Sequence, residues 1–137
     1  MALDVGSRRI GVAVSDELRV LARGLDTLER QSKRKDFEAI AALAREYVVT
    51  AVVVGHPVRL GGDKSPQTDK VETFAAELRR QLTVPVRLWD ERLTSVEAGE
   101  RLGRKRSARE HIAERKSGAV DRMAAVLILQ SYLDQGK

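Results

Sequence analysis

Apolar residues recur along the chain with two different spacings, and each spacing predicts a different kind of element. Alternating or continuous apolar runs predict strands over residues 2–5, 10–15, 20–25, 48–54 and 84–89. Apolar residues three and four positions apart predict helices over residues 37–47 and 71–82, and a last helix from Val120 onward. Thr94 followed by Glu97 has the pattern of a capping box, which predicts a further helix that begins there.

The order of these elements predicts an α/β fold. Gly6-Ser7-Arg8-Arg9 is a connection short enough for a hairpin between the first two strands. The run over residues 48–54 is apolar throughout and β-branched, which is typical of a strand buried on both faces of a parallel sheet. We expect a mixed five-stranded sheet flanked by helices. Its first three strands form an antiparallel meander and its last two lie parallel to the first, as in the RNase H-like fold.

Composition limits the class of protein. A chain of 137 residues is expected to form a single domain over residues 1–137, with a sizeable core. The absence of cysteine excludes disulfides and thiolate metal sites, and it fits a reducing compartment. No apolar run is long enough to cross a membrane. We therefore expect a cytoplasmic protein.

The charge balance favours a polyanionic partner, because the formal net charge is +5. Basic side chains gather in the first hairpin, after the strand over 84–89, and ahead of the last helix. As candidate nucleic-acid contacts they are Arg8, Arg9, Arg92, Arg104, Lys105, Arg106, Arg109, Arg115 and Lys116. Aromatic residues make up only 4% of the chain, which favours structured or duplex nucleic acid over extended single strands. The alternative for the basic segment is a solvated loop.

Acidic residues interrupt three of the apolar elements. Asp4 stands between two apolar strand residues, Asp90 and Glu91 end the strand over 84–89, and Asp121 lies in the first turns of the last helix. A buried carboxylate is costly unless it is paired or holds a metal ion. Strand alternation places Asp90 and Glu91 on opposite faces, so only one is expected to meet Asp4, and periodicity does not say which. The alternatives are that Asp4 faces water and that Asp121 only favours the positive end of its helix.

Clustered carboxylates suit metal-assisted hydrolysis of phosphodiesters. Mg²⁺ and Mn²⁺ prefer oxygen ligands, and two such ions about 4 Å apart can activate a water and stabilise the leaving oxygen. With no cysteine and only His56 and His111, the chain has few ligands for a zinc site. The sequence therefore predicts a Mg²⁺- or Mn²⁺-dependent nuclease.

Four motifs resemble those of the YqgF/RuvX family, and together they span almost the whole chain. They are Asp4-Val5-Gly6-Ser7-Arg8-Arg9 with the strand that follows, Val53-Val54-Gly55-His56-Pro57 with Gly61-Gly62, Asp90-Glu91-Arg92-Leu93-Thr94-Ser95 with Glu97-Ala98, and Val120-Asp121 with Ala124-Ala125. The resemblance implies an RNase H-like fold related to RuvC-type Holliday junction resolvases. It also implies that Asp4, Glu91 and Asp121 are the catalytic, metal-binding acids, which selects Glu91 over Asp90 by analogy. One departure is His56, where the family more often has Leu; we interpret it as a loop substitution.

The family is described both as a pre-16S ribosomal RNA nuclease and as a Holliday junction resolvase, so the resemblance leaves the substrate open. We expect a metal-dependent endonuclease for structured nucleic acid, acting on the 5′ end of pre-16S rRNA. The alternative substrate is a four-way DNA junction, whose two symmetric cuts favour a homodimer. A non-catalytic nucleic-acid-binding adaptor is the alternative of another class. An actin-like ATPase is disfavoured, because such proteins need two halves of this topology around the nucleotide.

Overall fold

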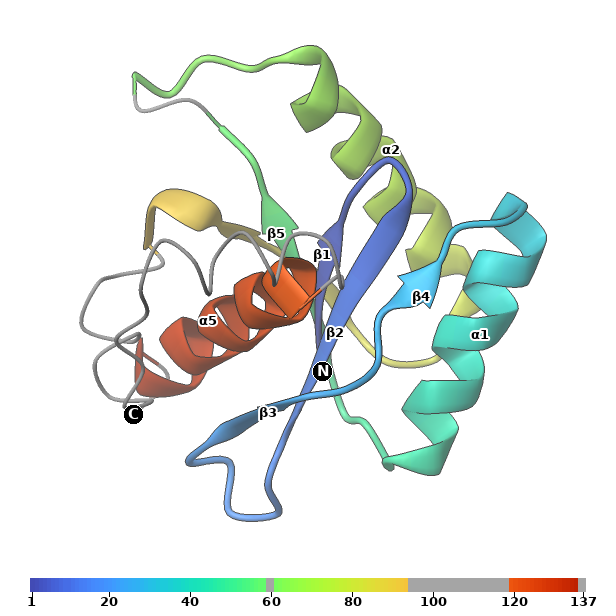
Figure 1. Cartoon of the computed structure of the whole chain (residues 1–137), viewed down its shortest axis with the longest axis vertical. Coiled ribbons are helices and arrows are strands. Elements are labelled where there is room, and N and C mark those ends of the chain that lie inside the picture. The colour runs from blue at the N-terminus through green and yellow to red at the C-terminus, as the bar shows by residue number, and fades with distance from the viewer. Residues whose placement is uncertain (59–60, 94–118, 136–137) are drawn as a thin grey trace.

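The structure is a computed structural model that describes residues 1–58, 61–93 and 119–135. In the described part, helices lie on both faces of one mixed sheet (Figure 1). The strands are β1 (Ala2–Val5), β2 (Arg9–Ser15), β3 (Ala22–Gly24), β4 (Leu28–Glu29), β5 (Val52–His56) and β6 (Val86–Asp90). The helices are α1 (Lys33–Glu46), α2 (Pro66–Gln81) and α5 (Ala119–Gln135), with a short 3₁₀ turn, η1 (Glu91–Leu93).

The strand order is β3-β2-β1-β5-β6. β1 pairs antiparallel with β2 and parallel with β5, β2 pairs antiparallel with β3, and β5 pairs parallel with β6. This pairing confirms the predicted meander and the predicted parallel strands. β1 therefore has a hydrogen-bonded neighbour on each side, which fixes Asp4 in the middle of the sheet.

The predicted number of strands is wrong, because the described sheet has six strands. The additional strand, β4, has two residues and pairs with β2, with Leu28 opposite Ile10. A two-residue segment is too short to give a periodic pattern, so the sequence contained no signal for it.

The strand predicted over residues 48–54 begins later, at Val52. Val48 has a φ of 51°, and its backbone N–H donates to the carbonyl of Arg45 at 3.2 Å. Residues 48 and 49 therefore complete the turn that ends α1, and their apolar side chains extend the run without extending the strand. Of the two, Val48 is highly exposed.

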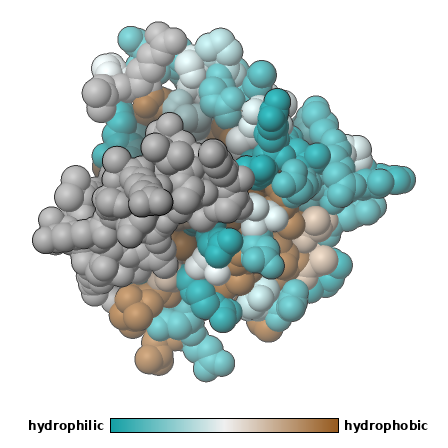
Figure 2. Space-filling model, viewed as in Figure 1, coloured by the Kyte–Doolittle hydropathy of each residue, from teal (hydrophilic) through white to brown (hydrophobic). Residues whose placement is uncertain are grey.

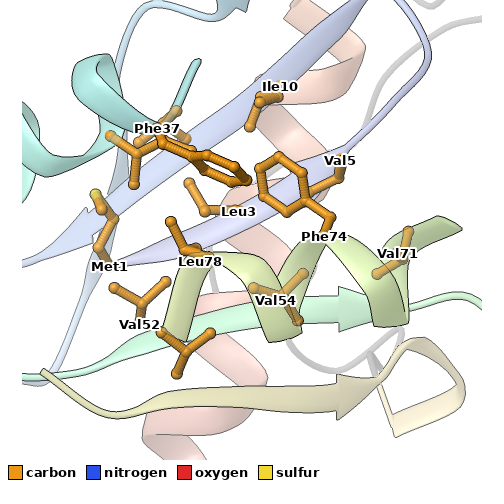
Figure 3. Packing of buried hydrophobic residues seen from close by; sticks show 14 of the residues in the cluster. Met1, Leu3, Val5, Ile10, Phe37, Val52, Val54, Val71, Phe74 and Leu78 are labelled. Atoms are coloured by element: carbon orange, nitrogen blue, oxygen red, sulfur yellow. The ribbon is translucent and has the colours of Figure 1, made fainter. Parts of the chain in front are cut away.

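One face of the sheet carries a large apolar core under α1 and α2 (Figure 3). Alternate residues of β1 point into it, and the rings of Phe37 and Phe74 meet there at 5.1 Å between centroids. The core residues labelled in the figure are Met1, Leu3, Val5, Ile10, Phe37, Val52, Val54, Val71, Phe74 and Leu78. Large side chains thus hold these two helices to the sheet.

The other face is covered by α5 and is built from smaller residues (Figure 1). Ala2 of β1 and Ala13 of β2, which are register partners, pack with Val53 of β5 against Ala125 and its neighbours on α5. Because strand side chains alternate between faces, Asp4 points to the same face as Ala2. The helix that carries Asp121 therefore lies on the face to which Asp4 points.

Each of the two helices on the large-residue face begins at a serine cap. The Ser32 side chain accepts a hydrogen bond from the backbone N–H of Lys35, and Ser65 forms a reciprocal capping box with Thr68. The Thr68 hydroxyl also donates to the carbonyl of Pro57, which ties the start of α2 to the end of β5. The helix predicted from Thr94 lies outside the described residues.

Candidate active site

The parallel strands β1, β5 and β6 all end at one end of the sheet, which we call the active end. Their last residues are Val5, His56 and Asp90, and the register places His56 beside Asp90. Ligands of open α/β sheets commonly bind outside the carboxyl ends of parallel strands. Two of the acids predicted from the sequence fall at this end: Asp4 is the next-to-last residue of β1, and Glu91 directly follows β6.

Asp4 and Glu91 meet at the active end. Asp4 is half-buried in β1, and Glu91 is the first residue of η1, directly after β6. Their side chains lie within hydrogen-bond reach of each other, and the bond forms when one of the two carboxyl groups is protonated. The structure thus brings together two of the three acids that the sequence predicted.

Gly55 makes room for this contact. A Cβ at Gly55 would lie 2.8 Å from Oε1 of Glu91 and 2.6 Å from Cδ1 of Ile128, closer than real Cβ contacts. The Glu91 carboxylate therefore lies directly over the backbone of β5, next to α5. Any side chain at position 55 would have to displace both the Glu91 carboxylate and the terminal methyl group of Ile128.

Burial raises the pKa of the Glu91 carboxyl above its ordinary value. The nearby Asp90 charge acts in the same direction, whereas the hydrogen bond with Asp4 and the charge of His56 act against it. Two ionised carboxylates in contact repel each other, and a shared proton or a bound cation relieves this repulsion.

Asp90 is turned away from this pair and binds Arg92. Oδ2 of Asp90 lies 2.6 Å from a terminal nitrogen of Arg92, and the backbone N–H of Arg92 donates to Oδ1 at 2.9 Å. The Arg92 guanidinium holds the pKa of the Asp90 carboxyl below its usual range. The choice between Asp90 and Glu91, which alternation had left open, is thus decided by geometry: Glu91 is the one that contacts Asp4.

Asp121 lies in the first turn of α5, as the sequence predicted, but its side chain is outside the described residues. Positions 121, 125 and 128 recur along one face of an α-helix. Ala125 on that face is fully buried against the sheet, and Ile128 reaches the space over Gly55 beside Glu91. The backbone therefore places position 121 on the sheet-facing row, two turns before Ile128.

Among the described residues, no group of three or more histidine, cysteine, aspartate or glutamate side chains is arranged to hold a metal ion. Asp4 and Glu91 supply only oxygen donors, which is the donor set that Mg²⁺ and Mn²⁺ prefer. The donor chemistry of this pair fits such an ion. The side chain of the third predicted acid, Asp121, lies outside the described residues.

The predicted basic contacts divide into three groups. Arg8 is exposed in the turn between β1 and β2, whereas Arg9 is paired with Glu29 at 3.2 Å. Arg92 is partly exposed and is held at the active end by Asp90. The remaining six, Arg104, Lys105, Arg106, Arg109, Arg115 and Lys116, lie outside the described residues.

A second cluster at the active end was missed by the sequence reasoning. Nε2 of His56 lies 3.5 Å from Oε1 of Glu72 on α2, and the same Glu72 oxygen lies 3.0 Å from Nζ of Lys64. These residues come from three separate segments, so no spacing pattern connects them. The departure from the family pattern at position 56 was the one signal that could have indicated the cluster.

Within the described residues, no helix combines the length and apolar character needed to cross a membrane. The predicted cytoplasmic location stays a prediction.

Comparisons with known proteins agree with the fold. A family profile described as "RuvX: Holliday junction resolvase" matches residues 1–135. A Koribacter versatilis protein named "Putative pre-16S rRNA nuclease" is 45% identical over 98% of this chain and 86% of its own length. A Thermoanaerobacter pseudethanolicus protein of the same name is 46% identical over 100% of this chain and 96% of its own length.

A solved structure of Thermus thermophilus RuvC in complex with a Holliday junction substrate shares the fold. Its TM-score is 0.56 at 16% sequence identity, and the match covers 98% of this chain and 93% of RuvC. This likeness confirms the predicted RNase H-like architecture. Together with the profile match and the full-length relatives, it places the chain in a family of nucleases: this protein belongs to the RuvX family.

Proposed function

We propose that this protein is a divalent-metal-dependent endonuclease whose catalytic acids are Asp4, Glu91 and Asp121. The observation that carries the proposal is the contact between Asp4 and Glu91 on the face covered by α5. Two further features support it: Gly55 leaves space for the Glu91 carboxylate, and position 121 lies on the sheet-facing row of α5.

Each acid has a distinct role in this proposal. Asp4, fixed in the centre of the sheet, anchors the divalent ions, and Glu91 and Asp121 complete their ligands. Mg²⁺ or Mn²⁺ held by these acids would supply activation of a water and stabilisation of the leaving oxygen of a phosphodiester.

The basic residues are proposed to hold the sugar–phosphate backbone. Arg8 lies at the tip of the hairpin that carries Asp4, and Arg92 follows Glu91 directly. Arg9 and the segment over residues 104–116 complete the proposed track. Phosphate contacts position the substrate without reading its sequence.

Replacing Arg104, Lys105 and Arg106 with Ala tests the basic segment. The slope of log binding constant against log salt concentration should fall in magnitude by up to about 3. An unchanged slope would mean that this segment is only a solvated loop.

The names of the full-length relatives suggest pre-16S rRNA as the substrate, and we propose cleavage at its 5′ end. A four-way DNA junction is the second candidate, favoured by the family description and by the Holliday junction substrate of the RuvC complex. A resolvase makes two symmetric cuts, so the second candidate also requires a homodimer. A single cytoplasmic domain over residues 1–137 is proposed to carry the activity in either case.

A panel of labelled substrates tests the proposal. The full chain is incubated with a pre-16S rRNA fragment that carries its 5′ flank, a four-way DNA junction, a DNA duplex and a single strand. Each is tested with Mg²⁺, with Mn²⁺ and with EDTA. We expect cleavage of the rRNA fragment with either ion and none in EDTA.

The outcomes separate the candidates. Preferential, symmetric cleavage of the junction by a dimer would favour the resolvase. Tight binding without cleavage, under every metal condition, would favour the adaptor and contradict the nuclease proposal.

A further inference from the structure

A second row of charged and polar side chains borders the acid pair at the active end. It runs from Lys64 through Glu72 and His56 to Asp90 and Arg92. Lys64 pairs with Glu72 and Arg92 pairs with Asp90, while His56 lies between the two acids as the ion-pair partner of Glu72 and the strand neighbour of Asp90. Basic and acidic residues therefore alternate along the row.

Strand alternation places this row on the side of the sheet opposite to Glu91. Gly55 faces α5, so the next residue, His56, points toward α2, where Glu72 lies. His56 is nevertheless the register neighbour of Asp90, and Glu91 directly follows Asp90. The row therefore borders the acid pair at the carboxyl ends of β5 and β6, where a bound nucleic-acid strand would lie.

The loop before α2 brings Lys64 and Arg92 to the same place. Gly62 adopts a φ of +86°, which favours glycine, and its Cβ position would lie 3.6 Å from a terminal nitrogen of Arg92. Lys64 follows two residues later and is mostly exposed. Its hydrogen bond lowers the pKa of the Glu72 carboxyl, so Glu72 faces His56 as a carboxylate.

The His56–Glu72 contact leaves one ring nitrogen for a ligand. Nε2 of His56 and Oε1 of Glu72 are both buried, and at 3.5 Å they form no hydrogen bond of ordinary geometry. A carboxylate oxygen only accepts, so a hydrogen bond across this contact would require the proton on Nε2. Because Nε2 is buried while about 20% of the His56 side chain is exposed, the exposed part lies elsewhere on the side chain, which also carries Nδ1.

We propose that His56 is a further substrate-binding residue: it contacts the sugar–phosphate backbone on the α2 side of the active end, between Lys64 and Arg92. Glu72 is its positioning residue, since its carboxylate faces Nε2 of the ring at 3.5 Å and is itself held by Lys64. The proposal rests on the proposed nuclease function only in its choice of ligand, a nucleic-acid backbone.

Binding without cleavage tests the proposal directly. Fluorescence anisotropy with the labelled pre-16S fragment and with the four-way junction is measured in Ca²⁺, an ion chosen so that affinity is read without turnover. We expect His56→Leu to weaken binding of at least one of these probes about tenfold, and His56→Gln to recover part of the loss, because a hydrogen bond to a charged group is lost and partly restored. Glu72→Gln should weaken binding less, by about threefold.

The double variant distinguishes positioning from a general structural effect. If Glu72 acts through His56, then His56→Leu with Glu72→Gln should bind no more weakly than His56→Leu alone. Glu77→Gln is the matched control, because Glu77 is on the same helix and pairs with a lysine, Lys33, at 3.2 Å in a cluster that does not include His56. That control should leave binding and the thermal midpoint unchanged.

The proposal is overturned if His56→Leu binds both probes as tightly as wild type, or if wild type binds neither. It is also overturned if the double variant loses affinity by the product of the losses of His56→Leu and Glu72→Gln. A fall in the thermal midpoint that accounts for the binding loss would also contradict it. Cleavage by Asp4→Asn at the wild-type rate is a separate failure, which concerns the acid centre and leaves the His56 result intact.

Discussion

The two faces of the sheet are built from side chains of different size. Under α1 and α2 the strands contribute Leu3, Val5 and Ile10, which pack with aromatic rings in a large apolar core. Under α5 the same strands contribute Ala2 and Ala13, with no aromatic ring among the fully buried residues of that cluster. The first face is suited to stability, whereas the second allows a helix and a carboxylate to approach the backbone closely.

β1 shows how one strand serves both purposes. Its residues alternate between the faces, so Leu3 and Val5 enter the large core while Ala2 and Asp4 face α5. The costly carboxylate at position 4 is therefore held by a strand whose alternate residues are fully buried. Stability and chemistry come from neighbouring residues of the same segment.

The surface continues this contrast. In Figure 2 the visible side over α1 and α2 is mostly hydrophilic, and apolar spheres stand out near the turn that joins β2 and β3. Leu18 in that turn is 81% exposed. This turn is at the end of β2 opposite to the hairpin beside Asp4, so the exposed apolar residues lie away from the acids.

Removal of a large side chain from the first face should have the largest effect on stability. Leu78→Ala deletes a fully buried side chain of α2, and we expect it to lower the free energy of unfolding by about 2–5 kcal/mol. Urea unfolding measures this change. Cleavage per folded molecule should stay at the wild-type value, and a loss of activity in the folded fraction would contradict the separation of the two faces.

Addition of one methyl group to the second face should affect activity more than stability. Gly55→Ala places a Cβ within 2.8 Å of Oε1 of Glu91, so the carboxylate has to move. We expect about 1–3 kcal/mol of destabilisation and a loss of single-turnover cleavage of about 100-fold, because misplaced catalytic groups lose rate steeply.

Gly61→Ala is the matched control for this variant. The nearest atom to its added Cβ would be Oδ2 of Asp63 at 3.7 Å, an ordinary contact. Both stability and cleavage should therefore be close to wild type. Equal losses of cleavage activity in the two variants would mean that the close approach of the Glu91 carboxylate to Gly55 is not required for activity.

The smallest predicted effect on stability is at Val48, in the turn that ends α1 and outside both faces of the sheet. Val48 is a β-branched residue at a φ of 51°, where such side chains are strained, and it is 81% exposed. Val48→Gly should therefore stabilise the protein by about 1 kcal/mol without changing cleavage. Thr50 is an exposed residue nearby without a positive φ, so Thr50→Gly should instead destabilise the protein by about 0.5–1 kcal/mol. Thermal unfolding measures both variants, and a lower midpoint for Val48→Gly than for wild type would contradict the prediction.

The sequence predicted the architecture because apolar spacing reflects burial directly. The antiparallel meander, both parallel strands and the last helix were confirmed. The start of the strand before His56 was misplaced because Val48 and Val49 are apolar residues of a turn, and periodicity does not distinguish a turn from a strand in such a short run.

The site was predictable only in part. The positions of Asp4 and Glu91 followed from acids in apolar elements, but alternation could not choose between Asp90 and Glu91. That choice depends on the 3₁₀ turn after β6, in which Arg92 folds back onto Asp90. The pairing of His56 with Glu72 depends on where α2 lies over β5, and tertiary placement of that kind has no spacing signal.

The central claim is that Asp4, which lies in β1 and faces α5, has a catalytic and not a structural role. The most direct test is single-turnover cleavage of the pre-16S fragment by Asp4→Asn, compared with wild-type protein at the same Mg²⁺ or Mn²⁺ concentration. The folded fraction and the binding of the fragment in Ca²⁺ are measured in parallel. Asn keeps the size of Asp and removes the charge that a divalent ion needs. The account predicts that cleavage is abolished while folding and binding are retained; cleavage at the wild-type rate would contradict it.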